Sequence, residues 1–136
     1  MDRTPKFLKM CEGAFKDIGI IDDGLSWVNP EKIQNLWARL GKDGKYYRLT
    51  QATIPEKEGW FQVYYQDQLQ EKIEKYDLEN LLVEFYCFIS GRIPKTNEII
   101  HEPRWTKPSS MEQFWLSFTM WEKHRKIWNN KKEKWK

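Results

Sequence analysis

The sequence predicts an α+β fold that is mostly helical, with about five helices and one small antiparallel β-hairpin. Apolar residues recur at three- and four-residue steps in several segments, as they do along one face of a helix. Two runs rich in aromatic and β-branched residues flank a loop with Pro and Gly, which is typical of paired strands. Of the 136 residues, 40% are hydrophobic and 15% aromatic, enough to build a core.

A first helix is expected from Thr4-Pro5 to Gly19. Threonine caps helix starts, proline suits the first helical turn, and glycine commonly follows the last turn. The apolar residues in between fall on one face: Phe7, Leu8, Cys11, Ala14, Phe15 and Ile18.

A second helix is expected from Asn29-Pro30-Glu31 to Gly41, because Asn and Pro favour a helix start and an acid suits its positive end. Its apolar stripe is Ile33, Leu36, Trp37 and Leu40.

The predicted hairpin follows a turn cluster at residues 41–45. Its strands are expected within residues 46–54 and 60–65, joined by the loop Pro55–Gly59 and paired with each other. A lone two-stranded hairpin is marginal in water, so a helix is expected to cover it.

Two further helices are expected at Gln66 to Lys75 and at about Leu78 to Ser90, the second capped by Asp77. The apolar arc of the second is wide, which predicts a place at the centre of the core. The loop Arg92 to Pro108 follows and is read either as a lid or as a recognition segment.

The last helix is expected to start at Ser109 or Ser110, with Glu112 or Gln113 completing a capping box. Four aromatic residues recur along it at seven-residue steps: Phe114, Trp121, Trp128 and Trp135. The first two rings are expected in the core and Trp128 at its border. Trp135, between Lys134 and Lys136, is the ring that is hardest to bury.

Residues 110–128 resemble the ending of a group of small phage and prophage proteins, with the pattern S-x-E-Q-L-W-L-A-F-x-M-x-E-K-Y-x-K-x-W. The segment 66–71 (QDQLQE) is similar to their upstream P-x-Q-x-Q-L-Q-E-M segment. Tyr64, Lys72 and His124 depart from the pattern, where the group has Pro, Met and Tyr. The resemblance implies a viral origin and no particular activity. The matched positions of the ending are Ser110, Glu112, Gln113, Trp115, Leu116, Phe118, Met120, Glu122, Lys123, Lys126 and Trp128.

The charge pattern suggests a single globular domain at residues 1–128 with a basic tail at 129–136. From Lys123 onward seven basic residues accompany one acid, Glu133, so this segment carries +6 and the preceding chain −3. A solvated helix end explains such a cluster, and so does an anionic partner. The candidate surface for a partner or nucleic acid is Arg125, Lys126, Lys131, Lys132, Lys134 and Trp135.

No catalytic, metal or cofactor-binding residues are expected. The two histidines, His101 and His124, lack partners at ligand spacing, and no serine lies in a nucleophile motif. An enzyme would need convergent acids around positions such as Asp22 or Glu84, or around His101. Cys11 and Cys87 are read as buried free thiols, with a disulfide between them left open.

These observations favour a cytoplasmic, non-enzymatic phage or prophage accessory protein. It would bind a host or viral macromolecule, most simply a host or phage protein, to inhibit a host defence or to regulate expression. The alternative is a nucleic-acid-binding module that uses the basic C-terminal helix and tail. No segment is apolar enough to span a membrane, and no signal peptide is apparent.

Overall fold

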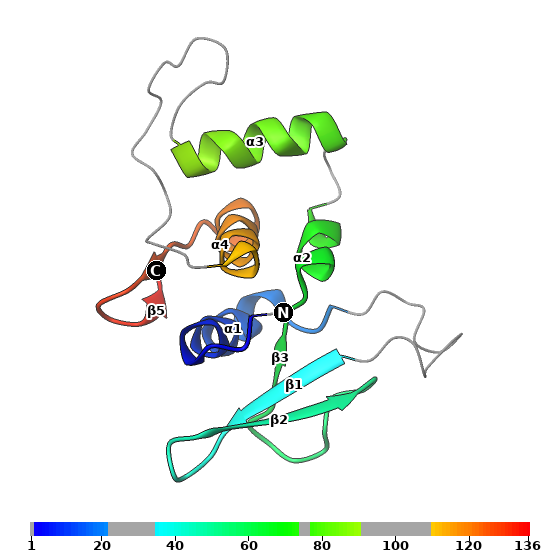
Figure 1. Ribbon diagram of the computed structural model, residues 1–136, viewed down its shortest axis with the longest axis vertical. Coiled ribbons are helices and arrows are strands. Elements are labelled where there is room, and N and C mark those ends of the chain that lie inside the picture. The colour runs from blue at the N-terminus through cyan, green and yellow to red at the C-terminus, as the bar shows by residue number, and fades with distance from the viewer. Residues whose placement is uncertain (1, 22–34, 74–76, 91–109) are drawn as a thin grey trace.

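A computed structural model of the chain describes residues 2–21, 35–73, 77–90 and 110–136 (Figure 1). These residues form an α+β fold with four helices, a three-stranded antiparallel sheet and a separate two-stranded hairpin. The described part therefore has four helices where about five were predicted. In chain order the elements are α1 (Pro5–Ile18), β1 (Asn35–Leu40), β2 (Tyr46–Gln51), β3 (Phe61–Val63), α2 (Gln66–Lys72), α3 (Leu78–Ser90), α4 (Met111–His124), β4 (Trp128–Asn129) and β5 (Lys134–Trp135).

Helix α1 confirms the first predicted helix, including both of its ends. The Thr4 hydroxyl accepts a hydrogen bond from the Phe7 N–H at 3.3 Å, and Pro5 occupies the first turn. Gly19 ends the helix with φ 73°, a conformation that glycine adopts without strain. The helix lies between the sheet and α4, so its apolar face is covered from both sides (Figure 1).

Strand β1 overturns the second predicted helix in the part of it that the structure describes; residues 29–34 lie outside that part. The sheet order is β2-β1-β3, which makes β1 the central strand, paired on both edges. Its residues 35–38 are all buried, so no alternation of apolar and polar residues marks it as a strand. The spacing of Leu36, Trp37 and Leu40 fits a helix as well as it fits a strand. The segment forms a strand because its backbone pairs with β2 on one edge and β3 on the other.

The predicted pairing of the two strands after residue 45 is also wrong, because β1 lies between β2 and β3. Trp37 of β1 stands opposite Leu49 on one side and Gln62 on the other. The turn predicted at residues 41–45 is confirmed and joins β1 to β2. There the Gly41 N–H donates to the Lys45 carbonyl at 2.8 Å, and Gly44 takes φ 80°.

Helix α3 occurs where it was predicted, whereas α2 ends at Lys72, three residues before its predicted end. Asp77 caps α3 by accepting from the Asn80 N–H at 2.8 Å. The expected place of α3 at the centre of the core is wrong. It lies on the outer side of α4 (Figure 1), with Leu82 and Tyr86 54% and 43% exposed. Its inner side packs through Phe85, whose ring stacks on Trp115 of α4 with centroids 4.4 Å apart.

The starts of α1 and α4 are joined through Asp2. Ser110, one of the two predicted caps, caps α4 by accepting from the Gln113 N–H at 3.2 Å. Ser109 lies outside the described residues. The Asp2 carboxylate accepts from the Ser110 hydroxyl, from the Gln113 side-chain amide at 2.8 Å and from the Thr4 N–H at 2.9 Å. Partial burial opposes ionisation of Asp2, but these hydrogen bonds together leave its pKa below the ordinary value.

A buried group of side-chain amides fixes the path of the chain after α1. The Gln62 amide accepts from the Ile21 N–H at 2.8 Å and donates to the Ile21 carbonyl at 3.1 Å. The Gln68 amide donates to the Asn35 side-chain oxygen at 2.7 Å and accepts from the Tyr65 N–H at 3.0 Å. Each of these amides has a partner, so the group orders the core without leaving a polar atom of theirs unsatisfied.

Candidate functional site

Helix α4 ends earlier than the aromatic stripe suggested. Arg125 adopts the left-handed conformation with φ 54°, and its N–H donates back to the Trp121 carbonyl at 3.0 Å. Trp128 and Trp135 therefore lie beyond the helix, and the expected continuation of the helical stripe to Trp128 is wrong. Phe114 and Trp121 are half-buried against the core.

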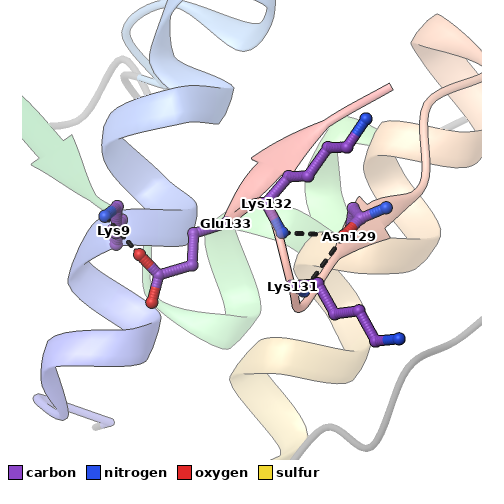
Figure 2. Close-up of polar contacts among 5 residues, drawn as sticks. All are labelled: Lys9, Asn129, Lys131, Lys132 and Glu133. Atoms are coloured by element: carbon purple, nitrogen blue, oxygen red, sulfur yellow. Dashed lines mark hydrogen bonds and ion pairs between the residues drawn. The ribbon is translucent and has the colours of Figure 1, made fainter.

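The last ten residues, 127–136, form a β-hairpin, which we call the C-terminal hairpin. Trp128 pairs with Trp135, and Ile127 and Lys136 exchange backbone hydrogen bonds of 2.9 and 3.0 Å. Asn129 shapes the turn: its side-chain oxygen accepts from the N–H groups of Lys131 and Lys132 at 3.0 and 2.9 Å (Figure 2). Such a side-chain bond holds the turn in one conformation.

Two tryptophans attach this hairpin to α1. Trp128 is 4% exposed, Trp135 is partly buried, and their rings meet edge to face with centroids 5.2 Å apart. The Trp135 indole N–H donates to the Met10 carbonyl at 2.9 Å. A Cβ on Gly13 would lie 3.0 Å from the Trp135 ring, so this glycine makes room for the indole on the helix surface.

Two ion pairs add to the attachment. The Lys126 ammonium lies 2.7 Å from the Asp17 carboxylate of α1, and Glu133 in the turn contacts Lys9 of α1 (Figure 2). The boundary predicted at residue 128 falls inside this hairpin. Residues 129–136, expected as a tail, are thus folded onto the first helix.

The structure brings together three of the six predicted surface residues. Lys131, Lys132 and Lys134 are exposed on the C-terminal hairpin. The Lys126 ammonium forms an ion pair with the Asp17 carboxylate. The remaining two residues make aromatic contacts of their own.

These two residues, Arg125 and Trp135, do not offer a free stacking surface. The Arg125 guanidinium lies over the Trp121 ring, 4.9 Å from its centroid. The Trp135 ring packs on Gly13 of α1, and its indole N–H donates to the Met10 carbonyl.

Sequence reasoning missed three members of this region. Asn129 builds the turn, and the Asn129-Asn130 pair was a turn signal in the sequence. Lys136 lies close to Lys132, and its pKa is lowered first by that contact, then by slight desolvation and by the charge of Lys134. Lys16 shares a small cavity of about 200 Å³ with Lys134, and no local sequence signal linked these distant residues.

Of the residues considered for chemistry, the structure describes both cysteines, His124 and Glu84. Cys11 and Cys87 are both free thiols; Cys11 is fully buried and Cys87 half-buried. Burial raises the pKa of each thiol, and the Glu84 charge adds to the effect at Cys87. Within the described ranges, no three His, Cys, Asp or Glu residues gather to hold a metal ion. His124 ends α4, Glu84 is exposed on α3, and Asp22 and His101 lie outside the described residues.

No helix in the described part of the chain is long and apolar enough to cross a bilayer. The chain matches no protein-family profile, no curated protein and no solved structure. The geometry of the C-terminal hairpin is that of exposed lysine side chains on a backbone fixed by its contacts with α1.

Proposed function

We propose that this protein is a non-enzymatic accessory protein of a phage or prophage, and that it binds a host or viral macromolecule through the C-terminal hairpin. The observation that carries this is the exposed group Lys131, Lys132 and Lys134 on a turn shaped by Asn129. The resemblance of residues 110–128 to phage and prophage proteins supports the origin. Inhibition of a host defence or regulation of expression would follow from occupying the partner.

A fixed hairpin is better suited to binding than a loose tail. Ordering a flexible segment on binding costs conformational entropy, and the backbone of residues 127–136 is ordered before any partner arrives. The exposed lysines attract an acidic surface from a distance and raise the rate of encounter. The favoured partner is therefore a protein with an acidic patch.

The test is capture of partners from host lysate at low salt, comparing the protein with the variant Lys131→Glu, Lys132→Glu, Lys134→Glu. Reversal of these charges is expected to abolish capture of the specific partner. The matched control reverses Arg3, Lys42 and Lys72, which lie outside residues 127–136. Equal loss with both variants, or equal capture with all three proteins, would contradict the proposal.

A nucleic acid is the second candidate, favoured by the crowding of Lys132, Lys134 and Lys136. The pKa of Lys136 is lowered first by its contact with Lys132 and last by the charge of Lys134, and phosphates would neutralise these crowded ammonium groups. Because the Trp135 ring packs against α1, contact would be with the sugar-phosphate backbone, without base stacking and without sequence preference.

Binding to DNA and RNA should then weaken with salt, and reversing three lysines should reduce the salt slope by about 2–3. The measurement is a titration of labelled single- and double-stranded oligonucleotides by fluorescence anisotropy at several salt concentrations. Absence of binding near 50 mM salt would remove this candidate, since electrostatic binding is strongest there.

A further inference from the structure

Strand β2 is an open edge of the three-stranded sheet. It is the outermost strand on its side, and no other strand of the described residues pairs with its free edge. Its residues 47–50 are exposed on both faces, with Tyr47 47% and Leu49 39% accessible. Alternate residues of such a strand direct their N–H and C=O groups away from the sheet. Proteins usually cover or shorten an edge of this kind.

A depression adjoins this edge on the face that carries Leu49. It has a volume of about 540 Å³ and is lined by Leu49, Gln51, Ile54, Lys57 and Trp60 among others. Ile54 is 41% exposed. The Arg39 guanidinium lies 5.4 Å from the centroid of the Trp60 ring. The depression thus offers apolar walls. Lys57 and Glu56 also line it, and Arg39 lies beside its Trp60 wall.

The charges around β2 are predominantly positive. Residues 39–60 contain five basic and three acidic side chains. One of the acids, Asp43, is occupied locally: it accepts from the Tyr47 hydroxyl at 2.6 Å and from the Lys45 N–H at 3.1 Å. Arg48 projects from the strand itself, on the opposite face from Leu49.

We propose that β2 receives an extended acidic segment of a partner protein, which adds to the sheet as a fourth strand. An extended backbone is what pairs with a row of free strand N–H and C=O groups. Side chains of the added strand alternate between the two faces. Apolar ones on the Leu49 side enter the depression, and acidic ones on the other side approach Arg48.

Charge favours such a partner over a second copy of this chain. Two β2 strands side by side would bring Lys45 and Arg48 of both copies to one edge, and like charges across strands are destabilising. A partner strand with Glu or Asp at alternate positions turns the same charges into an attraction.

The experiment uses a blocked peptide of roughly eight alternating Val and Glu residues, about the length of a typical strand. Chemical shifts and hydrogen exchange of the full-length protein are followed by NMR. Saturable shifts are expected at the amides of residues 47–50, and slowed exchange at those alternate amides that point away from β1. A peptide with Lys in place of Glu should not bind. Two further peptides are N-methylated, one at the odd and one at the even residues. Only one of the two should fail to bind, because only one set of peptide N–H groups faces β2.

Two protein variants complete the test. Arg48→Glu should weaken peptide binding about tenfold, whereas the matched control Lys42→Glu, in the turn, should change it less than about twofold. The triple reversal of Lys131, Lys132 and Lys134 should leave peptide binding intact, which separates this proposal from the function of the C-terminal hairpin.

Three results would overturn the proposal. One is the absence of peptide binding at millimolar concentration. Another is equal binding by peptides N-methylated in either register. The third is protection of the β2 amides that appears without peptide as the protein concentration rises, because that would identify a second copy as the occupant.

Discussion

The two β-hairpins of this protein are stabilised in opposite ways. The hairpin β1–β2 has six residues in each strand, and its outer strand is exposed on both faces. The C-terminal hairpin has two residues in each strand, yet it contains the buried Trp128 and the partly buried Trp135. The long hairpin is held by its backbone pairing and by the central position of β1. The short one is held by side chains that contact α1, so ladder length is a poor guide to how firmly a hairpin is attached.

The largest expected effect is from Trp128→Ala, which removes the most buried contact of the C-terminal hairpin. Loss of a buried tryptophan typically lowers the free energy of unfolding by about 3–5 kcal/mol. The matched change on the other hairpin, Leu49→Ala, should cost less than about 1 kcal/mol because Leu49 is 39% exposed. Urea denaturation of both variants measures this. Similar losses of unfolding free energy in the two variants would show that the two hairpins do not differ in how much they depend on side-chain contacts.

The next effect concerns Asp2, which joins the starts of α1 and α4. Folding favours the ionised form because the pKa of Asp2 is lowered, so its contribution is present above the ordinary value of 3.8 and is lost as pH falls through the lower folded value. Asp2→Asn should reduce stability near neutral pH by about 1 kcal/mol, since the site is partly exposed to solvent. As the pH falls below 3.8, the free energy of unfolding of the variant should decrease less than that of the unmodified protein. An unchanged pH profile would exclude this role.

A smaller effect tests the close approach of Trp135 to Gly13. Gly13→Ala in a Trp135→Ala background should stabilise the protein by about 0.5–1 kcal/mol through helix propensity. With Trp135 present, the added Cβ meets the indole at 3.0 Å, and the gain should disappear. The double-mutant cycle is measured by chemical denaturation. Equal gains in both backgrounds would show that the indole does not rest on this glycine.

The smallest effects are those of the ion pairs. Lys126→Gln should cost about 0.5 kcal/mol, because Asp17 is only 23% exposed. Lys9→Gln should cost less, since both partners of the Lys9–Glu133 pair are about half exposed. Both losses, measured by urea denaturation, should shrink in about 1 M salt, which screens surface charges. A larger cost for Lys9→Gln than for Lys126→Gln would show that burial does not rank these two ion pairs.

Local signals in the sequence predicted the starts of α1, α3 and α4 and the end of α1. Thr4, Gly19, Asp77 and Ser110 each act within one turn of their own position, so neighbouring residues suffice to recognise them. Strand β1 was misread because its burial depends on β2 and β3, which come later in the chain. Its apolar residues fitted a helical period, and no local residue contradicted that interpretation.

At the candidate site, the exposure of Lys131, Lys132 and Lys134 was predictable from composition, but their arrangement was not. The seven-residue step from Trp128 to Trp135 fits a helix face and a cross-strand pair equally well. Arg125 ends α4 without the glycine that usually marks such a position. Only the Asn129-Asn130 turn signal distinguished the two structures. The contact of Lys16 with the same cavity depends on packing between distant segments.

The contact between α1 and the C-terminal hairpin has a consequence for synthesis on the ribosome. Among the described elements α1 is made before β3, α4 and β5, which pack against it, and β5 is the last of these three. Domains generally fold as the chain is made, and an uncovered apolar face is prone to aggregation. The part of the α1 surface that Trp135 covers, at Met10 and Gly13, therefore stays uncovered until β5 has been made.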